Sequence, residues 1–221
     1  MPKLGMEPVR RAEAINAALE CFCEYGIEKT TLDMVAAKAG FSKGIIAYYF
    51  TSKQQLIVES FRAFLLAYQR KSAAELTEDM QPRRMFEAVV DVSLPPLNKK
   101  ITGALNVSPL NGDDKICLPD EKVNTLTVHF ISRAASDPEI AQIAREVHAQ
   151  DVDSIAELFL YATGRQSAVS ANDKKAAYSL LAMMYGLSFF RITGFMPEGE
   201  TDNRAIAMDL IDKLLNTYER S

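Results

Sequence analysis

Apolar residues recur every three or four positions along almost the whole chain, and this spacing limits the possible folds more than any other feature. In the first predicted helix, from about Glu7 to Tyr25, the repeat consists of Val9, Ala12, Ile15, Leu19 and Phe22. A repeat of this length places apolar side chains on one face of an α-helix. No convincing run shows the strict alternation that is typical of strands. The sequence therefore predicts an all-α fold with about nine helices.

Capping residues and breakers indicate where these helices begin and end. Gly26 ends the first helix, and Thr30 with Asp33 three residues later has the spacing of a capping box. Gly40 ends the second helix, and Ser42 is a natural N-cap for a third helix reaching about Tyr49. The later helices are predicted from Thr51-Ser52, from about Arg83, over 121–135, from Asp137-Pro138 to Thr163-Gly164, over 171–193 and over 202–219.

Residues 94–119 are dense in breakers, with Pro95, Pro96, Gly103, Pro109 and Asn111-Gly112. This density predicts a long loop, and loops of that length inside compact domains are often functional. We interpret the segment as a lid or a variable insert.

The composition is that of a folded globular protein, with 48% hydrophobic and 24% charged residues among 221. The net charge of −4 is unevenly distributed, because residues 1–55 carry a net +1 and the remainder a net −5. This asymmetry permits a nucleic-acid partner near the N-terminus without requiring one. The sequence contains neither a long apolar span nor the apolar run of a secretory signal, so we expect a cytoplasmic protein with no membrane partner.

Residues capable of catalysis or metal binding are few and scattered. Cys21 and Cys23 point to different faces of one helix, and Cys117 is distant from both. His129 and His148 lie on different predicted helices, and Asp151 and Asp153 diverge on theirs. We therefore expect no catalytic site, no metal site and no cofactor.

The segment from Thr30 to Leu56 carries the strongest functional signal. Two short helices separated by a glycine turn form a helix-turn-helix, whose second helix can enter the major groove of DNA. Phe41, Ile46 and Phe50 provide apolar anchors. The residues left facing outward on the second helix are Ser42, Lys43, Gly44, Ile45, Ala47 and Tyr48.

In residues 8–57 the threonine cap, the Ala-Gly-Phe-Ser turn, the Tyr-Phe ending and the Ser-Lys-x-x-Leu restart together resemble the DNA-binding head of the tetracycline-repressor (TetR) family. The resemblance implies a two-domain homodimer that binds a palindromic operator and is released by a small molecule. It places DNA contacts on Thr31, Ser42, Lys43, Gly44, Ile45, Tyr48, Tyr49 and Lys53. Ala47 departs from the tyrosine common in the family, which puts that one contact in doubt.

A narrower resemblance, in Met1–Met6, Arg10-Arg11 and Gly44–Phe50, is to the choline-responsive repressors of glycine-betaine synthesis genes. It covers the head alone. The remainder of the chain has no tryptophan, and residues 94–119 depart from what that resemblance would imply.

We predict a DNA-binding domain over 1–50 and a ligand-binding and dimerisation domain over 51–221. The helix over 171–193 is apolar nearly all round, so a second subunit is the simplest cover for it. Candidate dimer residues are Leu181, Tyr185, Gly186, Leu210 and Leu214. Candidate effector-pocket residues are Phe64, Tyr68, Phe86, Phe130, Phe159 and Tyr185, although aromatic residues are more often simply part of a core.

Two alternatives stay open from the sequence. One is an enzyme with an all-helical body, for which we find no catalytic set. The other is a TetR-like regulator that responds to a protein or to DNA alone. Lys3, Arg10 and Arg11 fit either solvated surface charge or contacts to the DNA backbone.

Overall fold

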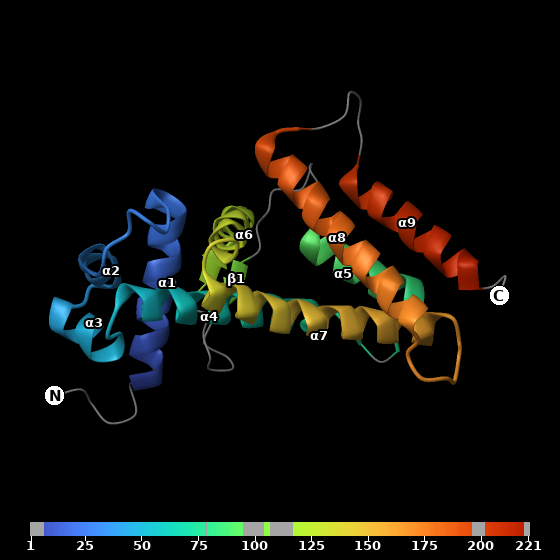
Figure 1. Ribbon diagram of the computed structural model, residues 1–221, viewed down its shortest axis with the longest axis horizontal. Coiled ribbons are helices and arrows are strands. Elements are labelled where there is room, and N and C mark those ends of the chain that lie inside the picture. The colour runs from blue at the N-terminus through green and yellow to red at the C-terminus, as the bar shows by residue number, and fades with distance from the viewer. Residues whose placement is uncertain (1–6, 78, 95–103, 107–116, 196–201, 219–221) are drawn as a thin grey trace. The chain divides into compact units, whose positions relative to one another are not determined.

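The computed structural model describes residues 7–77, 79–94, 104–106, 117–195 and 202–218 (Figure 1). Over these residues the chain is all-α with two short strands, which confirms the predicted fold class. The elements are α1 (Glu7–Tyr25), α2 (Leu32–Ala39), α3 (Lys43–Tyr49), α4 (Lys53–Ala74), α5 (Pro82–Ser93), β1 (Ala104–Asn106), β2 (Cys117–Pro119), α6 (Asp120–Ala134), α7 (Pro138–Ala162), α8 (Ala171–Thr193) and α9 (Asn203–Tyr218).

The chain forms two compact units. Unit 1 comprises residues 1–70 and 101–144, and unit 2 comprises residues 71–100 and 145–221. The division falls inside α4 and inside α7, so these bounds do not coincide with the predicted domains 1–50 and 51–221. The domain boundary near residue 50 remains a prediction. In the part of the chain that is described, no helix is long and apolar enough to cross a membrane.

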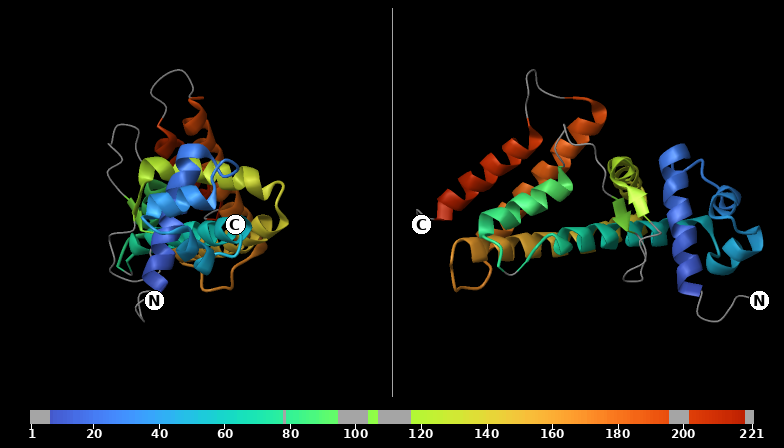
Figure 2. Two further views of the ribbon diagram at one scale, coloured as in Figure 1. Left: turned by 90° about the vertical axis from the view of Figure 1, so that its left-hand side faces the viewer. Right: turned by 180° about the vertical axis from the view of Figure 1, so that it is seen from behind.

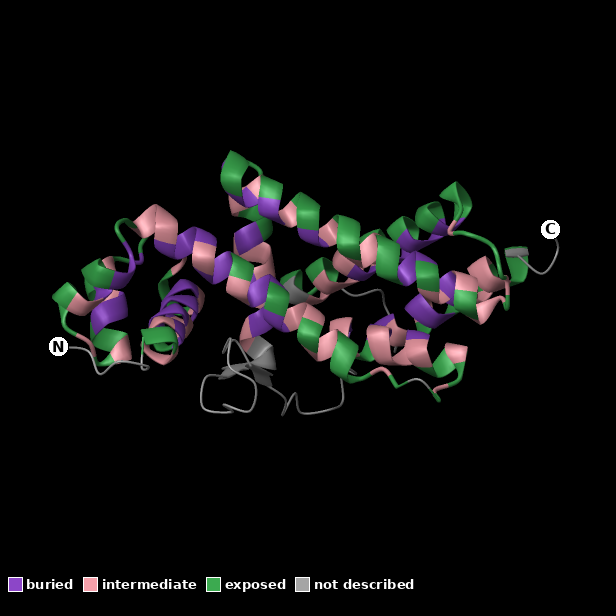
Figure 3. Ribbon diagram, turned by 90° about the horizontal axis from the view of Figure 1, so that it is seen from below, coloured by how far each residue is buried: buried purple, intermediate pink, exposed green. Residues whose placement is uncertain are grey.

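The core of unit 1 is centred on aromatic rings. Phe130 of α6 packs edge-on against Phe22 of α1, with ring centroids 6.2 Å apart, and lies 4.5 Å from Phe61 and 5.6 Å from Phe64 of α4. All four rings are buried, and buried residues are purple in Figure 3. Because aromatic rings bury large apolar areas, this cluster fixes α1, α4 and α6 against one another.

Two strands lie within the segment that the sequence predicted as a loop. β1 and β2 pair antiparallel, with Leu105 opposite Leu118, and contact α6 (Figure 2). The prediction of an uninterrupted loop over 94–119 is therefore wrong at these residues. Three-residue strands are too short to show an alternating pattern. The rest of that segment lies outside the described residues.

The start of α2 also differs from the predicted capping box. Thr31 is the N-cap, since its hydroxyl accepts the Met34 N–H at 3.2 Å. The Thr30 hydroxyl is buried and donates instead to the Gly26 carbonyl at 2.9 Å. Two adjacent threonines offer two possible caps, and the one that bonds back into the preceding turn cannot serve α2. Lys38 at the end of α2 pairs with Glu20 and Glu24 of α1.

Unit 2 has an aliphatic and aromatic core of its own. Phe86 of α5 and Phe159 of α7 lie with ring centroids 4.7 Å apart. The buried residues packed with them are Val90, Leu94, Ile155, Ala156, Ala176, Ala177, Leu180, Met184, Ala207, Met208 and Ile211. Ion pairs from Arg204 of α9 to Asp91 and Glu87 of α5 border this core.

The N-terminus of α8 is held by a buried carboxylate. Asp173 accepts the Ser170 N–H at 2.7 Å and the Ser170 hydroxyl at 2.6 Å, and it also pairs with Arg165. The Ser170 oxygen in turn accepts the Asp173 N–H at 3.2 Å, which completes a capping box. Burial alone would raise the pKa of Asp173, but the hydrogen bonds from Arg165 and Ser170 outweigh it and lower the pKa to about 2.

Asp173→Asn should destabilise the protein by about 2 kcal/mol at neutral pH, because a depressed pKa means that folding favours the ionised carboxylate. This contribution is fully present above the ordinary pKa of 3.8 and is lost as the pH falls towards 2. Urea unfolding followed as a function of pH measures it. The exposed Asp209 of α9 is the matched control, and Asp209→Asn should change the free energy of unfolding little. An equal loss at pH 7 and pH 2.5 would contradict the assignment.

Candidate nucleic-acid interface

The turn between α2 and α3 is fixed by a glycine in the left-handed region. Gly40 has φ 67°, and its N–H bonds to the Ala37 carbonyl at 3.2 Å while the Phe41 N–H bonds to the Ala36 carbonyl at 2.8 Å. A side chain at this φ would strain the backbone. As predicted, Ser42 then caps α3, because its hydroxyl accepts the Ile45 N–H at 3.4 Å. The geometry is that of a helix-turn-helix.

The two faces of α3 differ sharply in burial. Ile46, Tyr49 and Phe50 are buried in unit 1, which confirms two of the three predicted anchors, whereas Phe41 is only partly buried. The opposite face is exposed and carries Ser42, Lys43, Gly44, Ala47 and Tyr48, with Ile45 partly buried. The predicted outward set is therefore where the sequence placed it. Tyr49, also predicted to contact DNA, is only 4% exposed.

Arg11 of α1 anchors the C-terminal end of α3. Its Nη1 donates to the Tyr49 carbonyl at 3.2 Å, and its guanidinium lies 5.1 Å from the centroid of the Phe50 ring. It also pairs with Glu59 of α4. Arg11 therefore joins α1, α3 and α4 within unit 1, a role that the sequence did not indicate. Lys3 lies outside the described residues.

The polar groups predicted to contact DNA already have acceptors within the chain. Lys43 pairs with Asp33 of α2 at 2.5 Å, and the Tyr48 hydroxyl donates to Glu7 of α1 at 3.5 Å. Lys53, at the first turn of α4, donates to the Glu28 carbonyl at 2.7 Å. All of these contacts are exposed, so the cations are held at the surface where a phosphate could replace the acceptor.

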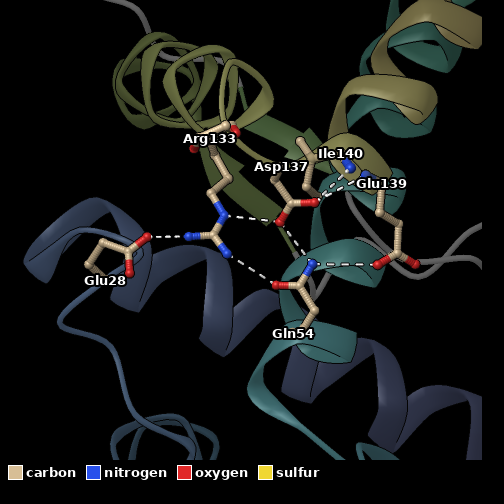
Figure 4. Close-up of polar contacts among 7 residues, drawn as sticks. Glu28, Gln54, Arg133, Asp137, Glu139 and Ile140 are labelled. Carbon is tan, nitrogen blue, oxygen red and sulfur yellow. Dashed lines mark hydrogen bonds and ion pairs between the residues drawn. The ribbon is translucent and has the colours of Figure 1, made fainter.

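A polar cluster that sequence analysis missed lies in the same unit (Figure 4). Arg133, in the last turn of α6, pairs with Glu28 and with Asp137, and it donates to the Gln54 side chain at 3.2 Å. Gln54 in turn donates to Asp137 at 2.8 Å and to Glu139 at 3.4 Å. No sequence signal could have indicated the cluster, because its contacts join residues up to 105 positions apart.

Asp137 is the most buried member of this cluster. It caps α7 as predicted, since its Oδ1 accepts the N–H groups of Glu139 at 3.1 Å and Ile140 at 3.3 Å. Burial alone would raise the pKa of its carboxyl, but hydrogen bonds from Gln54, Ile140 and Arg133 outweigh it and lower the pKa. Asp137 is therefore ionised at neutral pH.

The predicted effector residues fall in both units. Phe64 and Phe130 belong to the aromatic core of unit 1, and Phe86 and Phe159 belong to the core of unit 2. Tyr68 is partly buried and lies in unit 1. Tyr185 lies in unit 2, where its hydroxyl is 2.8 Å from His148 Nε2. Burial lowers the pKa of His148 despite the opposing charge of Asp151, so its imidazole is neutral at pH 7.

The predicted dimer residues lie on α8 and α9. Leu181 and Leu214 pack partly against the core of their own unit, and Leu210 and Gly186 are half-buried. The large apolar side chains that α8 exposes are instead Tyr178, Phe189 and Phe190, at 67%, 51% and 44%.

Potential metal ligands and nucleophiles do not gather in the described residues. No group of three or more His, Cys, Asp or Glu side chains there could hold a metal ion. Cys23 donates weakly to the Lys122 carbonyl at 3.6 Å, and burial raises its pKa to about 11. This thiol is therefore protonated and unreactive at neutral pH.

Comparison with known proteins shows which family the helix-turn-helix segment is similar to. Residues 14–59 match the family model described as bacterial regulatory proteins, tetR family. The HTH-type transcriptional regulator BetI of Agrobacterium fabrum is 40% identical over 93 residues, which span 42% of this chain and 45% of that protein. The BetI of Rhizobium meliloti is 36% identical over 93 residues, 42% of this chain and 46% of that protein. The chain thus matches less than half the length of these relatives, in the N-terminal region.

Solved structures extend the similarity of fold to nearly the whole chain. A transcriptional regulator from Rhodococcus sp. has a TM-score of 0.70 at 20% identity, covering 95% of this chain and 96% of its own. A transcriptional regulator from Saccharomonospora viridis, solved in complex with choline, has a TM-score of 0.67 at 19% identity, covering 91% and 93%. These named proteins are regulators rather than enzymes, in agreement with the expectation from the sequence.

Proposed function

We propose that this chain is a transcriptional repressor that binds palindromic operator DNA as a homodimer, because residues 14–59 match the family model of tetR bacterial regulatory proteins. A small-molecule effector would bind the C-terminal part and release the DNA. The observation that carries the proposal is the division of α3 into a buried anchoring face and an exposed face of small, polar and aromatic residues. Such a helix is suited to the major groove.

The proposed contacts on the exposed face have distinct tasks. Lys43 and Ser42 can reach base edges or phosphates, and Gly44 permits close approach of the backbone. The hydroxyls of Thr31 and Ser42 cap their helices as acceptors and still have a hydrogen to donate to a phosphate. Tyr48, Tyr49 and Lys53 complete the set with Ile45, and Tyr49 would have to use its hydroxyl, since its ring is buried.

Lys43→Ala and Tyr48→Ala should each raise the dissociation constant for DNA from upstream of the protein's own gene by about tenfold or more, because each removes a groove or phosphate contact. Fluorescence anisotropy with a labelled duplex measures this. Lys213→Ala is the matched control, because Lys213 is similarly exposed and also forms an ion pair at 2.5 Å, but on α9. Unchanged DNA affinity in both head variants, or an equal loss in the control, would remove α3 as the interface.

Homodimerisation is supported by the apolar surface of α8. Tyr178, Ala182, Gly186 and Phe189 follow one another at intervals of four, four and three residues, which places them on one face of the helix. A Cβ added at Gly186 would meet nothing within 4 Å in its own chain. This small, open position would let a partner helix approach closely. We propose that α8, with Leu210 and Leu214 of α9, forms a four-helix bundle with its mates.

Phe189→Asp should weaken the dimer by about 30-fold or more, because a charge would replace a large apolar side chain in the proposed interface. Sedimentation equilibrium over a range of concentrations measures the dimer constant, with circular dichroism to confirm folding. Tyr161→Asp on α7 is the control, since Tyr161 is exposed to a similar degree. A dimer that tolerates Phe189→Asp as well as the control would place the interface elsewhere.

The effector proposal concerns unit 2. Tyr185 and His148 provide a hydroxyl and a neutral imidazole in contact with each other, on helices α8 and α7 that also carry residues of the apolar core of unit 2. Pockets for small molecules typically combine apolar walls with a few polar groups. DNA affinity and effector affinity would be coupled reciprocally, typically by 1–3 kcal/mol. Choline is the first compound to test, because a protein of similar fold was solved with it and the named relatives of the head are BetI proteins.

Choline at 100 times its dissociation constant should add about 2.7 kcal/mol to the free energy of unfolding and weaken DNA binding in the same samples. A thermal-shift assay, followed by anisotropy, measures both effects. Betaine and sodium chloride at equal concentration are the controls. If choline and a panel of apolar compounds all leave the melting temperature and the DNA affinity unchanged, the regulator responds instead to a protein or to DNA alone.

A further inference from the structure

The guanidinium of Arg133 joins three segments of unit 1 that are far apart in the sequence. One Nη pairs with Glu28 in the turn after α1, the other donates to Gln54 at the start of α4, and Nε pairs with Asp137 at the start of α7 (Figure 4). Each nitrogen of the fork has its own partner. An ammonium group is a single point charge and cannot reproduce three such directed contacts.

Burial and charge balance hold this cluster in one arrangement. Asp137 is only 9% exposed, and it accepts hydrogen bonds from Arg133, Gln54 and two backbone N–H groups of α7. Gln54 is held at both ends of its amide, since its oxygen accepts from Arg133 and its nitrogen donates to Asp137. Networks of this kind fix side chains and the backbone that carries them.

Two residues of the cluster, Glu28 and Gln54, are also the neighbours of Lys53. Lys53 precedes Gln54 in the first turn of α4, and its ammonium donates to the carbonyl of Glu28, whose carboxylate is the partner of Arg133. Residues on both sides of the lysine contact, Glu28 and Gln54, are therefore held by the same guanidinium.

We infer that Arg133 is a positioning residue for the phosphate contact of Lys53, acting through Glu28 and Gln54 although it lies some 80 residues beyond the helix-turn-helix. The inference rests on the proposed DNA binding. Two other roles are possible for an arginine here, namely general attraction of DNA by its charge and a phosphate contact of its own. The three roles predict different outcomes for the same set of variants.

The first test is the salt dependence of binding to the upstream duplex for the wild type, Lys53→Ala, Arg133→Lys and the double variant. The measured quantity is the slope of the logarithm of the binding constant against the logarithm of the salt concentration. Each lost phosphate contact reduces the magnitude of this slope by about 0.9, hence by about 1.8 for the two heads of a dimer. We expect both single variants to lose about 1.8, and the double variant to lose no more than either. Arg133→Lys keeps the charge, so an unchanged slope would overturn the positioning role. Additive losses would show that Arg133 binds a phosphate itself and would also overturn it.

The second test is Glu28→Gln, which removes a negative charge near the DNA while leaving Arg133 in place. Electrostatics alone would tighten DNA binding, whereas loss of the Arg133 contact should weaken it and lower the slope. Tightened binding in this variant would overturn the inference. This test does not depend on Arg133→Lys, so it remains decisive if that variant fails to fold. Arg62→Lys, an exposed position on α4, is the control and should match the wild type.

Failure of the inference is distinguishable from failure of the proposed function. If the wild type shows no preference for the upstream duplex over random DNA, the proposed function falls. If the wild type binds specifically and Lys53→Ala alone lowers the slope, only the role of Arg133 falls. An unchanged slope in Lys53→Ala also overturns the inference, because no phosphate contact would then exist to be positioned.

Discussion

The exposed face of α3 depends on the anchoring of a helix that could not form alone. A helix of seven residues is far below the length at which isolated helices are stable in water, so its conformation must come from tertiary contacts. Ile46 and Phe50 supply these contacts from the buried side, Ser42 caps the first turn, and Arg11 binds the carbonyl of Tyr49 at the last. Because the backbone is fixed from within unit 1, the outward positions of α3 can carry polar or small side chains, or none at all as at Gly44, without unfolding the helix.

Much of the fold could be predicted, because helix periodicity and capping are local properties. Ser42 and Asp137 were identified as N-caps from a single polar residue before an apolar repeat, and both cap as expected. The prediction failed where local signals compete or are too short. Thr30 and Thr31 can both cap α2, and burial of the Thr30 hydroxyl against Gly26 decides between them. The pairing of β1 with β2 depends on contacts between two segments that a breaker-rich stretch separates in the sequence. Each strand has only three residues, which is too short for an alternating pattern to be recognised.

The candidate site was predictable to the extent that it lies on one helix. The outward face of α3 follows from helical spacing, so the exposed positions of Lys43 and Tyr48 could be predicted from sequence alone. The contacts of Arg11 and Arg133 could not, since an arginine carries the same charge whether it is solvated or joins three segments. Apart from Asp137, the partners of these two arginines lie 38 to 105 positions away. The burial of Tyr49, which is only 4% exposed, was likewise not indicated by the sequence.

An acidic chain that binds DNA must provide local cations without losing them to its own carboxylates. Here Lys43 is paired with Asp33, the Tyr48 hydroxyl with Glu7, and Lys53 with a carbonyl, so the proposed DNA binding would exchange these partners for phosphates rather than fill empty sites. Exposed ion pairs contribute about 0–1 kcal/mol, so the exchange costs little for each contact. The exchange would nevertheless leave Asp33 and Glu7 as unpaired negative charges near the duplex. Their repulsion would oppose every DNA sequence equally, so the proposed binding would require additional base contacts along α3, and this balance would disfavour random DNA.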